Sequence, residues 1–274
     1  MSVLQCNFYS KCLANFVDIT VYIPSYHNGD ITMGNMSLDV IYDKNQKFKT
    51  IYLLHGMLDD HSSWMRWSMV EEQAEKHRFA LVMPSGQNGF YVNAVHGLAY
   101  YDFINDELPR WAELNFPLLE GRENRFIAGL SMGGYGAMRH ALANPDKYAA
   151  VGAFSGALDL PGLADVLGGI PEIHNIVDYD SLFDGIEKIK GTDNDLYTLA
   201  SQCKVKAKEL PKVYITCGTE DIICIKMDRE YRDFLMEKGY DVTYYEMPGT
   251  HEWKVWNESI RRFMNLIDPE NATA

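Results

Sequence analysis

Nearly uninterrupted apolar runs alternate along this chain with stretches whose apolar residues recur at helical spacing. An apolar run with few polar positions predicts a strand that is buried on both faces. Such runs lie at 50–54, 79–83, 126–130, 149–154 and 212–217. Runs that alternate apolar and polar side chains predict half-buried strands, and they lie at 16–23, 36–42 and 242–246. Helical spacing is found at 68–76, 100–114, 134–143, 225–237 and 253–267.

The alternation of strands and helices predicts an α/β fold, with a mostly parallel sheet of roughly eight strands and helices on both faces. We expect residues 16–23 and 36–42 to pair as an antiparallel edge. We expect Pro109 to kink or delay the helix at 100–114. Residues 158–202 interrupt the alternation with scattered Gly and Asp, which predicts a small cap-like insertion over the edge of the sheet. The length of 274 residues is compatible with a single domain, 1–274.

The apolar run 126–130 ends in a Gly-x-Ser-x-Gly motif, Gly129-Leu130-Ser131-Met132-Gly133, and a helical pattern follows it. Strand, sharp turn and helix are the context that a nucleophile elbow requires, with Ser131 lifted above the edge of the sheet. Taken alone, the pentapeptide is also compatible with a glycine-rich turn whose serine caps the helix. The flanking strand and helix patterns favour the nucleophile.

Two further polar residues follow late strands of the predicted sheet. Asp221 comes after the run 212–217, and His251 comes after the run 242–246. The carboxyl ends of parallel strands meet at one edge, where ligands bind in open α/β sheets. The order Ser131, Asp221, His251 is that of a hydrolase in which His251 is the base and Asp221 orients it. Glu220 is the alternative acid.

The turn His55-Gly56-Met57 follows the early apolar run 50–54. Acyl transfer needs two backbone N–H groups directed at the developing oxyanion. We expect them to come from Met132, the residue after the nucleophile, and from Met57. We place His55, Trp64 and Trp253 at the substrate pocket. The alternatives are that His55 holds the turn by a hydrogen bond and that the tryptophans belong to the core.

The composition restricts the partners of the chain. The formal net charge of −13 argues against nucleic acid or an anionic membrane as partner. The segment Met1 to Asn7 lacks the features of a signal peptide, and no apolar run reaches membrane-spanning length. The five cysteines are an odd number without a tight framework, which predicts reduced thiols and a cytoplasmic location.

We expect a small-molecule substrate, no metal site, and a surface rich in Tyr and Met that suits a homo-oligomer.

Four segments together resemble the esterase D-like α/β-hydrolases, and the resemblance spans nearly the whole chain. They are Leu53-Leu54-His55-Gly56-Met57, Gly129-Leu130-Ser131-Met132-Gly133-Gly134-Tyr135-Gly136-Ala137, Cys217-Gly218-Thr219-Glu220-Asp221 and Pro248-Gly249-Thr250-His251-Glu252-Trp253. Within this group the chain is most similar to bacterial tributyrin esterases, which are related to the family-1 carbohydrate esterases that act on acetylxylan and feruloyl esters. The resemblance implies an α/β-hydrolase fold, no cofactor, and hydrolysis of short acyl esters. It also implies the triad Ser131, Asp221, His251 and the donors Met57 and Met132.

Two other activities on the same scaffold stay open, a thioesterase such as S-formylglutathione hydrolase and an acyltransferase. The S-formylglutathione hydrolases of the group usually carry a cysteine just after the oxyanion glycine, whereas this chain has Met57-Leu58-Asp59. A non-catalytic binding protein is the alternative from another class, because fold alone does not fix function.

Overall fold

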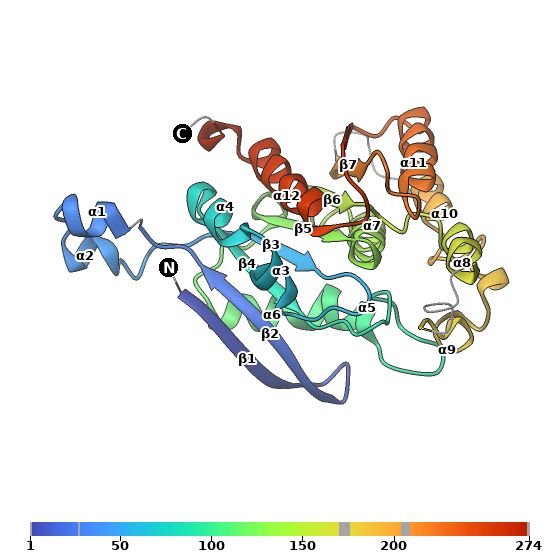
Figure 1. Ribbon diagram of the computed structural model, residues 1–274. Helices are drawn as coiled ribbons and strands as arrows, with labels where there is room; N and C mark the ends of the chain where they lie inside the picture. The colour runs from blue at the N-terminus through green and yellow to red at the C-terminus, as the bar shows by residue number, and fades with distance from the viewer. Residues whose placement is uncertain (1, 27, 170–175, 204–208, 273–274) are drawn as a thin grey trace.

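One sheet of eight strands forms the centre of the molecule (Figure 1). The computed structural model describes residues 2–26, 28–169, 176–203 and 209–272. The strand order is β1-β2-β4-β3-β5-β6-β7-β8. The strands are β1 Ser2–Ser10, β2 Asn15–Ile23, β3 Lys49–Leu54, β4 Phe79–Pro84, β5 Arg125–Leu130, β6 Ala150–Phe154, β7 Lys212–Gly218 and β8 Val242–Met247.

The sheet is parallel from β4 through β3, β5, β6 and β7 to β8. Strand β2 pairs antiparallel with both β1 and β4. Seven of the eight predicted runs, all except 36–42, are strands of this sheet. The order, the antiparallel pair at one end and the alternation with helices are those of the α/β-hydrolase fold. The predicted fold class is confirmed.

Helices cover both faces of the sheet, and each face has its own apolar core. One core packs against α7 Met132–Ala143 and α11 Ile225–Glu237. The other packs against α3 Ser63–Trp67, α4 Val70–His77 and α12 Trp253–Ile267. The bounds of α11 and α12 are those predicted from helical spacing.

The predicted strand at 36–42 is wrong, because the chain forms a short helix there, α2 Leu38–Ile41. Together with α1 Asn28–Met33 it makes an arm that extends away from the sheet (Figure 1). The strand that pairs antiparallel with β2 on the outer edge of the sheet is β1, which was not predicted. A turn of four residues, 11–14, joins β1 to β2. A hairpin this short loses little entropy on closing, so the local partner is favoured.

The helix predicted around Pro109 is interrupted by a π turn. Residues 100–115 form α5 Tyr100–Asp102, the π turn η1 Phe103–Glu107 and α6 Leu108–Asn115 without a break. Pro109 has no N–H to donate to the carbonyl of Asn105, four residues earlier. That carbonyl accepts a hydrogen bond from Lys147 Nζ instead, at 3.0 Å. The expected irregularity at Pro109 is therefore present.

The interruption at 158–202 contains α8 Leu160–Gly168, α9 Tyr179–Phe183, the 3-10 turn η3 Ile186–Lys188 and α10 Leu196–Gln202. Residues 170–175 of this segment lie outside the described residues. The segment is anchored on α7 through Asn194. Tyr135 donates its hydroxyl hydrogen to the Asn194 carbonyl at 2.8 Å, and Arg139 Nε donates to Asn194 Oδ1 at 2.9 Å.

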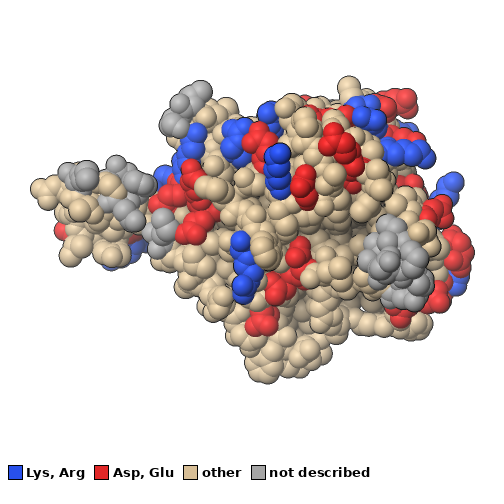
Figure 2. Space-filling model, viewed as in Figure 1, with Lys and Arg blue, Asp and Glu red and all other residues tan. Residues whose placement is uncertain are grey.

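Acidic and basic side chains are interspersed on the face of the molecule drawn in Figure 2. In the parts of the chain that the structure describes, no helix has both the length and the apolar character needed to cross a bilayer.

Glu107, in the π turn, holds the turn of the β1–β2 hairpin. Its carboxylate accepts hydrogen bonds from Ser10 Oγ at 2.5 Å, from Lys11 N–H at 2.6 Å and from Cys12 N–H at 2.9 Å. We predict that Glu107→Ala lowers the free energy of unfolding by about 1–3 kcal/mol, because hydrogen bonds to a charged acceptor are lost. Urea denaturation measures this change.

Asp106→Ala is the matched control. The Asp106 carboxylate is exposed and its ion pair with Lys147 is on the surface, so its removal should cost less than about 1 kcal/mol. Equal losses in the two variants would contradict the role of Glu107.

Candidate active site

Ser131 occupies the sharp turn between β5 and α7, with a strained backbone of φ 52° and ψ −117°. The turn requires glycine on both sides. A Cβ on Gly129 would lie 2.4 Å from the Gly133 carbonyl oxygen, and a Cβ on Gly133 would lie 2.5 Å from the Leu54 carbonyl oxygen. The Ser131 side chain makes no capping hydrogen bond to α7. The alternative of a capping serine therefore does not apply.

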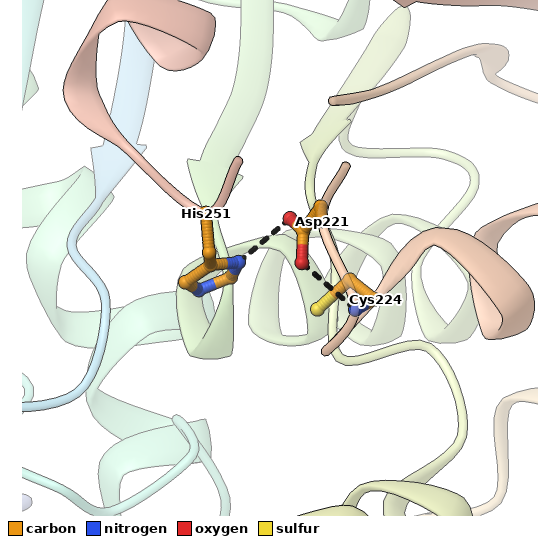
Figure 3. Close-up of side chains that lie close together, drawn as sticks. All are labelled: Asp221, Cys224 and His251. Carbon is orange, nitrogen blue, oxygen red and sulfur yellow. Dashed lines mark hydrogen bonds and ion pairs between the residues drawn. The ribbon is translucent and has the colours of Figure 1, made fainter. Parts of the chain in front are cut away.

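Ser131, His251 and Asp221 form a continuous hydrogen-bonded array at the carboxyl edge of the sheet. His251 Nε2 lies 3.0 Å from Ser131 Oγ, and His251 Nδ1 lies 2.8 Å from Asp221 Oδ2. Figure 3 shows the imidazole directed at the Asp221 carboxylate. Because a carboxylate only accepts, Nδ1 carries the ring hydrogen and Nε2 is free to accept from Ser131. The three residues follow β5, β7 and β8, as the sequence predicts.

The Asp221 carboxylate is buried but well provided with donors. Its Oδ1 accepts the N–H groups of Ile223 at 3.1 Å and Cys224 at 3.0 Å, at the start of α11. Burial by itself raises the pKa of Asp221, but the hydrogen bond and charge of His251 outweigh it and hold the pKa below the usual value. Glu220 is exposed and accepts the Gly249 N–H at 2.9 Å. Asp221, and not Glu220, contacts His251.

Cys224 lies beside these two residues, and a cysteine, an aspartate and a histidine together resemble a metal-binding set (Figure 3). A metal would need the Cys224 thiolate. Burial and then the charges of Asp228 and Asp221 raise the pKa of Cys224 well above its usual value, so it is a neutral thiol. Both carboxylate oxygens of Asp221 already have partners within the protein. The set fits a proton-transfer array better than a metal centre.

The turn His55-Gly56-Met57 lies against the nucleophile. A Cβ on Gly56 would be 3.5 Å from Ser131 Cβ. Among the described residues, no acceptor is hydrogen bonded to the backbone N–H of Met57 or to that of Met132. Two N–H groups beside a serine hydroxyl are what an oxyanion site needs.

The side chain of His55 does not face the site, which corrects the expected contact with substrate. It is 1% exposed. Its Nδ1 donates to the Gly56 carbonyl at 2.7 Å, and its Nε2 accepts the Gly86 N–H at 2.8 Å. The Tyr91 hydroxyl donates to the His55 carbonyl at 2.9 Å. His55 therefore fixes the shape of the turn, which is the alternative that the sequence left open.

The two tryptophans are placed differently. Trp64 is 1% exposed, and its indole N–H donates to the Leu54 carbonyl at 3.0 Å, so it belongs to the core and not to the pocket. Trp253 is half-buried, and its ring packs edge-on against Trp64 with the ring centroids 5.2 Å apart. The burial of a large aromatic side chain depends on tertiary packing, so the position of Trp64 in the sequence does not indicate whether its side chain is buried.

Sequence reasoning missed Tyr91 and Asp228. Tyr91 lies in a loop without a recognisable motif. Asp228 had a signal, because it falls on the buried stripe of α11 formed by Met227, Tyr231 and Leu235. A charged residue type at that spacing indicates a specific partner.

An α/β-hydrolase fold with a Ser–His–Asp array beside two free N–H groups defines a serine hydrolase. A model of the Esterase family matches residues 29–264. The chain belongs to this family, and it is a carboxylic ester hydrolase with a small-molecule ester as substrate.

Three relatives are similar over nearly the whole chain. The acetyl esterase of Caldicellulosiruptor saccharolyticus is 32% identical over 266 residues, which are 95% of this chain and 96% of the relative. The fluorophosphonate-binding serine hydrolase F of Staphylococcus aureus is 27% identical with a TM-score of 0.82, over 97% of this chain and 98% of that one. The S-formylglutathione hydrolase of Staphylococcus aureus is 26% identical with a TM-score of 0.79, over the same shares.

The burial of His55 predicts a dependence of stability on pH. Burial lowers the pKa of His55 in the folded protein to about 4, from an ordinary value of 6.5. Between these values the unfolded chain binds a proton that the folded chain does not, so the free energy of unfolding falls as the pH is lowered from 6.5 to 4. The shift corresponds to roughly 3 kcal/mol. Urea denaturation at several pH values measures it.

His55→Asn keeps a donor near Nδ1 but does not titrate, so its stability should fall less steeply on acidification. Part of the dependence remains, because burial also lowers the pKa of His140. His96→Asn is the control, since that ring is exposed and loses little water on folding. Parallel curves for wild type and His55→Asn would contradict the prediction.

Proposed function

We propose that Ser131, His251 and Asp221 are the catalytic triad of this esterase and that it hydrolyses short-chain acyl esters, from acetyl to butyryl. The observation that carries the proposal is the unbroken pair of hydrogen bonds, 3.0 Å from Ser131 to His251 and 2.8 Å from His251 to Asp221. A serine hydroxyl is a weak nucleophile unless a base stands beside it.

The reaction follows from this arrangement. Ser131 Oγ attacks the ester carbonyl carbon while His251 Nε2 takes the hydroxyl proton. The tetrahedral intermediate collapses, the bond to the leaving alcohol breaks, and His251 returns the proton to the alcohol oxygen. Water then attacks the acyl-enzyme with the same assistance, and Ser131 and the carboxylic acid are released. Asp221 keeps the ring hydrogen on Nδ1 and stabilises the imidazolium.

The backbone N–H groups of Met57 and Met132 are the proposed oxyanion donors. They bind the carbonyl oxygen more strongly as negative charge develops on it. The helix α7 begins at Met132, and its N-terminal dipole adds positive potential at the same place. Each such donor typically contributes roughly 3 to 4 kcal/mol to transition-state stabilisation.

The preference for short acyl groups rests on similarity to the acetyl esterase of Caldicellulosiruptor saccharolyticus. Acetylated or feruloylated sugars are within the proposed substrate class. A thioesterase is the second candidate, because the S-formylglutathione hydrolase of Staphylococcus aureus shares the fold over 97% of this chain. An acyltransferase would use the same acyl-enzyme with another acceptor.

We place the substrate-selecting region in residues 158–202, as a cap within a single domain, 1–274. The segment begins beside the nucleophile, since Ala157, the residue directly before it, donates its N–H to the Ser131 carbonyl at 3.1 Å. A cavity of about 420 Å³ lies between this segment and α7, lined in part by Tyr135, Leu158 and Leu196.

We propose a cytoplasmic location on the basis of the odd number of cysteines. Assembly as a homo-oligomer is proposed from exposed apolar side chains on the arm, namely Leu38, Val40 and Tyr42.

A panel of esters tests the substrate class. It contains para-nitrophenyl acetate, butyrate and octanoate together with S-formylglutathione. We expect kcat/KM for acetate or butyrate to exceed that for octanoate by at least about tenfold, because surplus methylenes do not fit a small acyl pocket. Ser131→Ala should reduce every rate on the order of a million-fold.

Faster turnover of S-formylglutathione than of any ester would move the assignment to a thioesterase. A Ser131→Ala variant with wild-type activity would contradict the assignment of the triad.

The identity of the acid is tested by a pair of isosteric variants. Asp221→Asn should lower kcat on the order of ten-thousand-fold, because the amide no longer holds the productive tautomer of His251. Glu220→Gln should stay within about threefold of wild type, because the Glu220 carboxylate accepts from Gly249 N–H and Thr219 Oγ1 and does not contact His251. Steady-state hydrolysis of para-nitrophenyl acetate provides both values. The reverse order would assign the acid to Glu220.

A further inference from the structure

The strained backbone of Ser131 is hydrogen bonded on both sides to the last residue of β6 and to the residues that follow it. The Ser131 N–H donates to the Phe154 carbonyl at 2.9 Å, and the Ser131 carbonyl accepts the Ala157 N–H at 3.1 Å. We call residues 154–157 the bracket. The bracket is itself irregular, since Ser155 has φ 45°. A residue in a sparsely populated backbone region persists only when its surroundings fix it.

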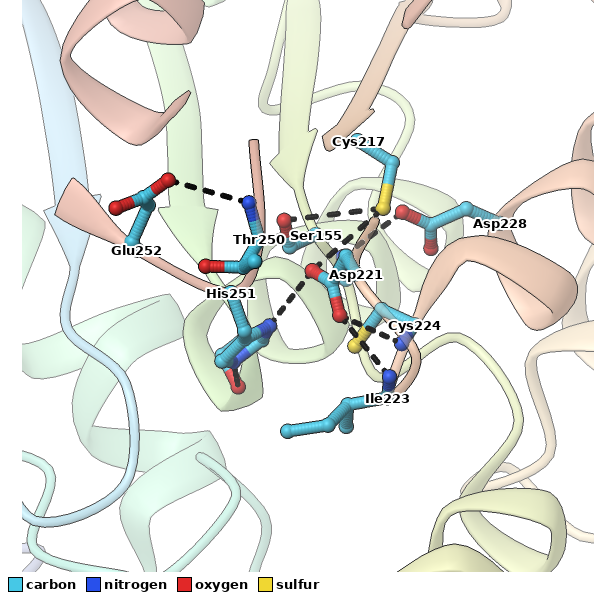
Figure 4. Close-up of polar contacts among 11 residues, drawn as sticks. Ser155, Cys217, Asp221, Ile223, Cys224, Asp228, Thr250, His251 and Glu252 are labelled. Atoms are coloured by element: carbon cyan, nitrogen blue, oxygen red, sulfur yellow. Dashed lines mark hydrogen bonds and ion pairs between the residues drawn. The ribbon is translucent and has the colours of Figure 1, made fainter. Parts of the chain in front are cut away.

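A buried carboxyl group on α11 holds the middle of this bracket. Asp228 is 0% exposed, and its Oδ2 accepts the Gly156 N–H at 3.2 Å. Its Oδ1 has no hydrogen-bond partner among the described residues. Figure 4 shows the Asp228 carboxyl beside the Cys217 thiol, on the side away from His251. Asp228 does not touch Ser131 or His251, and the proposed reaction does not use it.

The same helix also carries the support of Asp221. The Ile225 N–H, in the first turn of α11, donates to the Asp221 carbonyl at 3.0 Å, and the Cys224 N–H binds the Asp221 carboxylate. Asp228 follows one turn later, with its N–H bonded to the Cys224 carbonyl at 2.9 Å. A single rigid helix thus joins the acid loop to the bracket around the nucleophile.

We infer that Asp228 is a positioning residue: its carboxyl oxygen holds the Gly156 N–H and thereby fixes the Ser131 peptide relative to the loop of Asp221. The inference rests on the proposed function, because it concerns the distance between Ser131 as the nucleophile and Asp221 as the acid. In this inference, the hydrogen bond from Gly156 to Asp228 maintains that distance. Catalysis is sensitive to such distances, since a misplacement of about 1 Å costs about a hundredfold in rate.

The protonation of the Asp228 carboxyl group determines which substitution is the most conservative one. The titratable groups that interact electrostatically with Asp228 include Asp221, Cys217, Cys224 and Glu246. Burial and then the charge of Asp221 raise the pKa of Asp228 well above its usual value, which favours the neutral acid. A neutral acid and an amide of the same shape both offer an oxygen to the Gly156 N–H. Asparagine is therefore the conservative replacement.

Two variants of Asp228 distinguish the hydrogen bond that its side chain accepts from the space that the side chain fills. Asp228→Leu keeps the branched shape of the side chain, with two methyl groups in place of the two oxygens, but accepts no hydrogen bond. We expect kcat to fall about 10- to 100-fold with KM within about threefold of wild type. Asp228→Asn should keep kcat within about threefold. Rates for para-nitrophenyl acetate are expressed per active site titrated with a fluorophosphonate, so that misfolded molecules do not count. Asp228→Ala, which is smaller and also lacks an acceptor, replaces the leucine variant if that variant does not fold.

The exposed Asp233, on the same helix, provides the control, and Asp233→Leu should leave kcat and KM unchanged. Wild-type kcat in Asp228→Leu, or in Asp228→Ala where the leucine variant does not fold, would overturn the inference. An Asp228→Asn variant as slow as Asp228→Leu would overturn it too, because the acceptor oxygen would then not be the function of the side chain.

Ser131→Ala, measured in parallel, separates the two proposals. If Ser131→Ala is inactive while Asp228→Leu is fully active, only the positioning role of Asp228 fails. If Ser131→Ala is active, both proposals fail.

Discussion

The strained backbone of Ser131 is the constraint on which the rest of the site depends. A non-glycine residue at φ 52° and ψ −117° costs about 1–3 kcal/mol, and the surrounding structure has to supply that energy. The sheet supplies it from three directions. Glycines at 129 and 133 let strand and helix approach, the turn after β3 packs against the serine, and the segment after β6 binds both polar groups of its peptide.

The parallel sheet brings the other two residues of the proposed triad to the strained serine. Ser131, Asp221 and His251 are separated by 90 and 30 positions in the sequence, yet each follows a strand that ends at the same edge. The burial of Asp221 also orients its carboxylate. The Asp221 carboxylate is fixed by two backbone N–H groups of the turn that leads into α11, those of Ile223 and Cys224. The imidazole therefore finds an oriented partner, and little reorganisation is needed when charge develops.

The errors of sequence reasoning have physical causes. Alternating polarity at 36–42 predicts a strand, but a strand needs an edge to pair with, and the hairpin β1–β2 already occupies that edge of β2. His55 and Trp64 are near the site in sequence but point into the interior, where their ring hydrogens meet backbone carbonyls. The sequence pattern alone indicates only which residues lie next to a turn. The direction of each side chain depends on what packs against that turn.

The sequence by itself determined the α/β class, the elbow at Ser131 and the loops of Asp221 and His251, because these rest on local patterns of periodicity, glycine and chain order. Only the tertiary structure decided that Asp221, rather than its neighbour Glu220, meets His251, since one faces inward and the other faces solvent. It also decided the contact of Asp228 with Gly156, which joins residues 72 positions apart. Such contacts depend on how helices pack on the sheet, and no local pattern encodes that geometry.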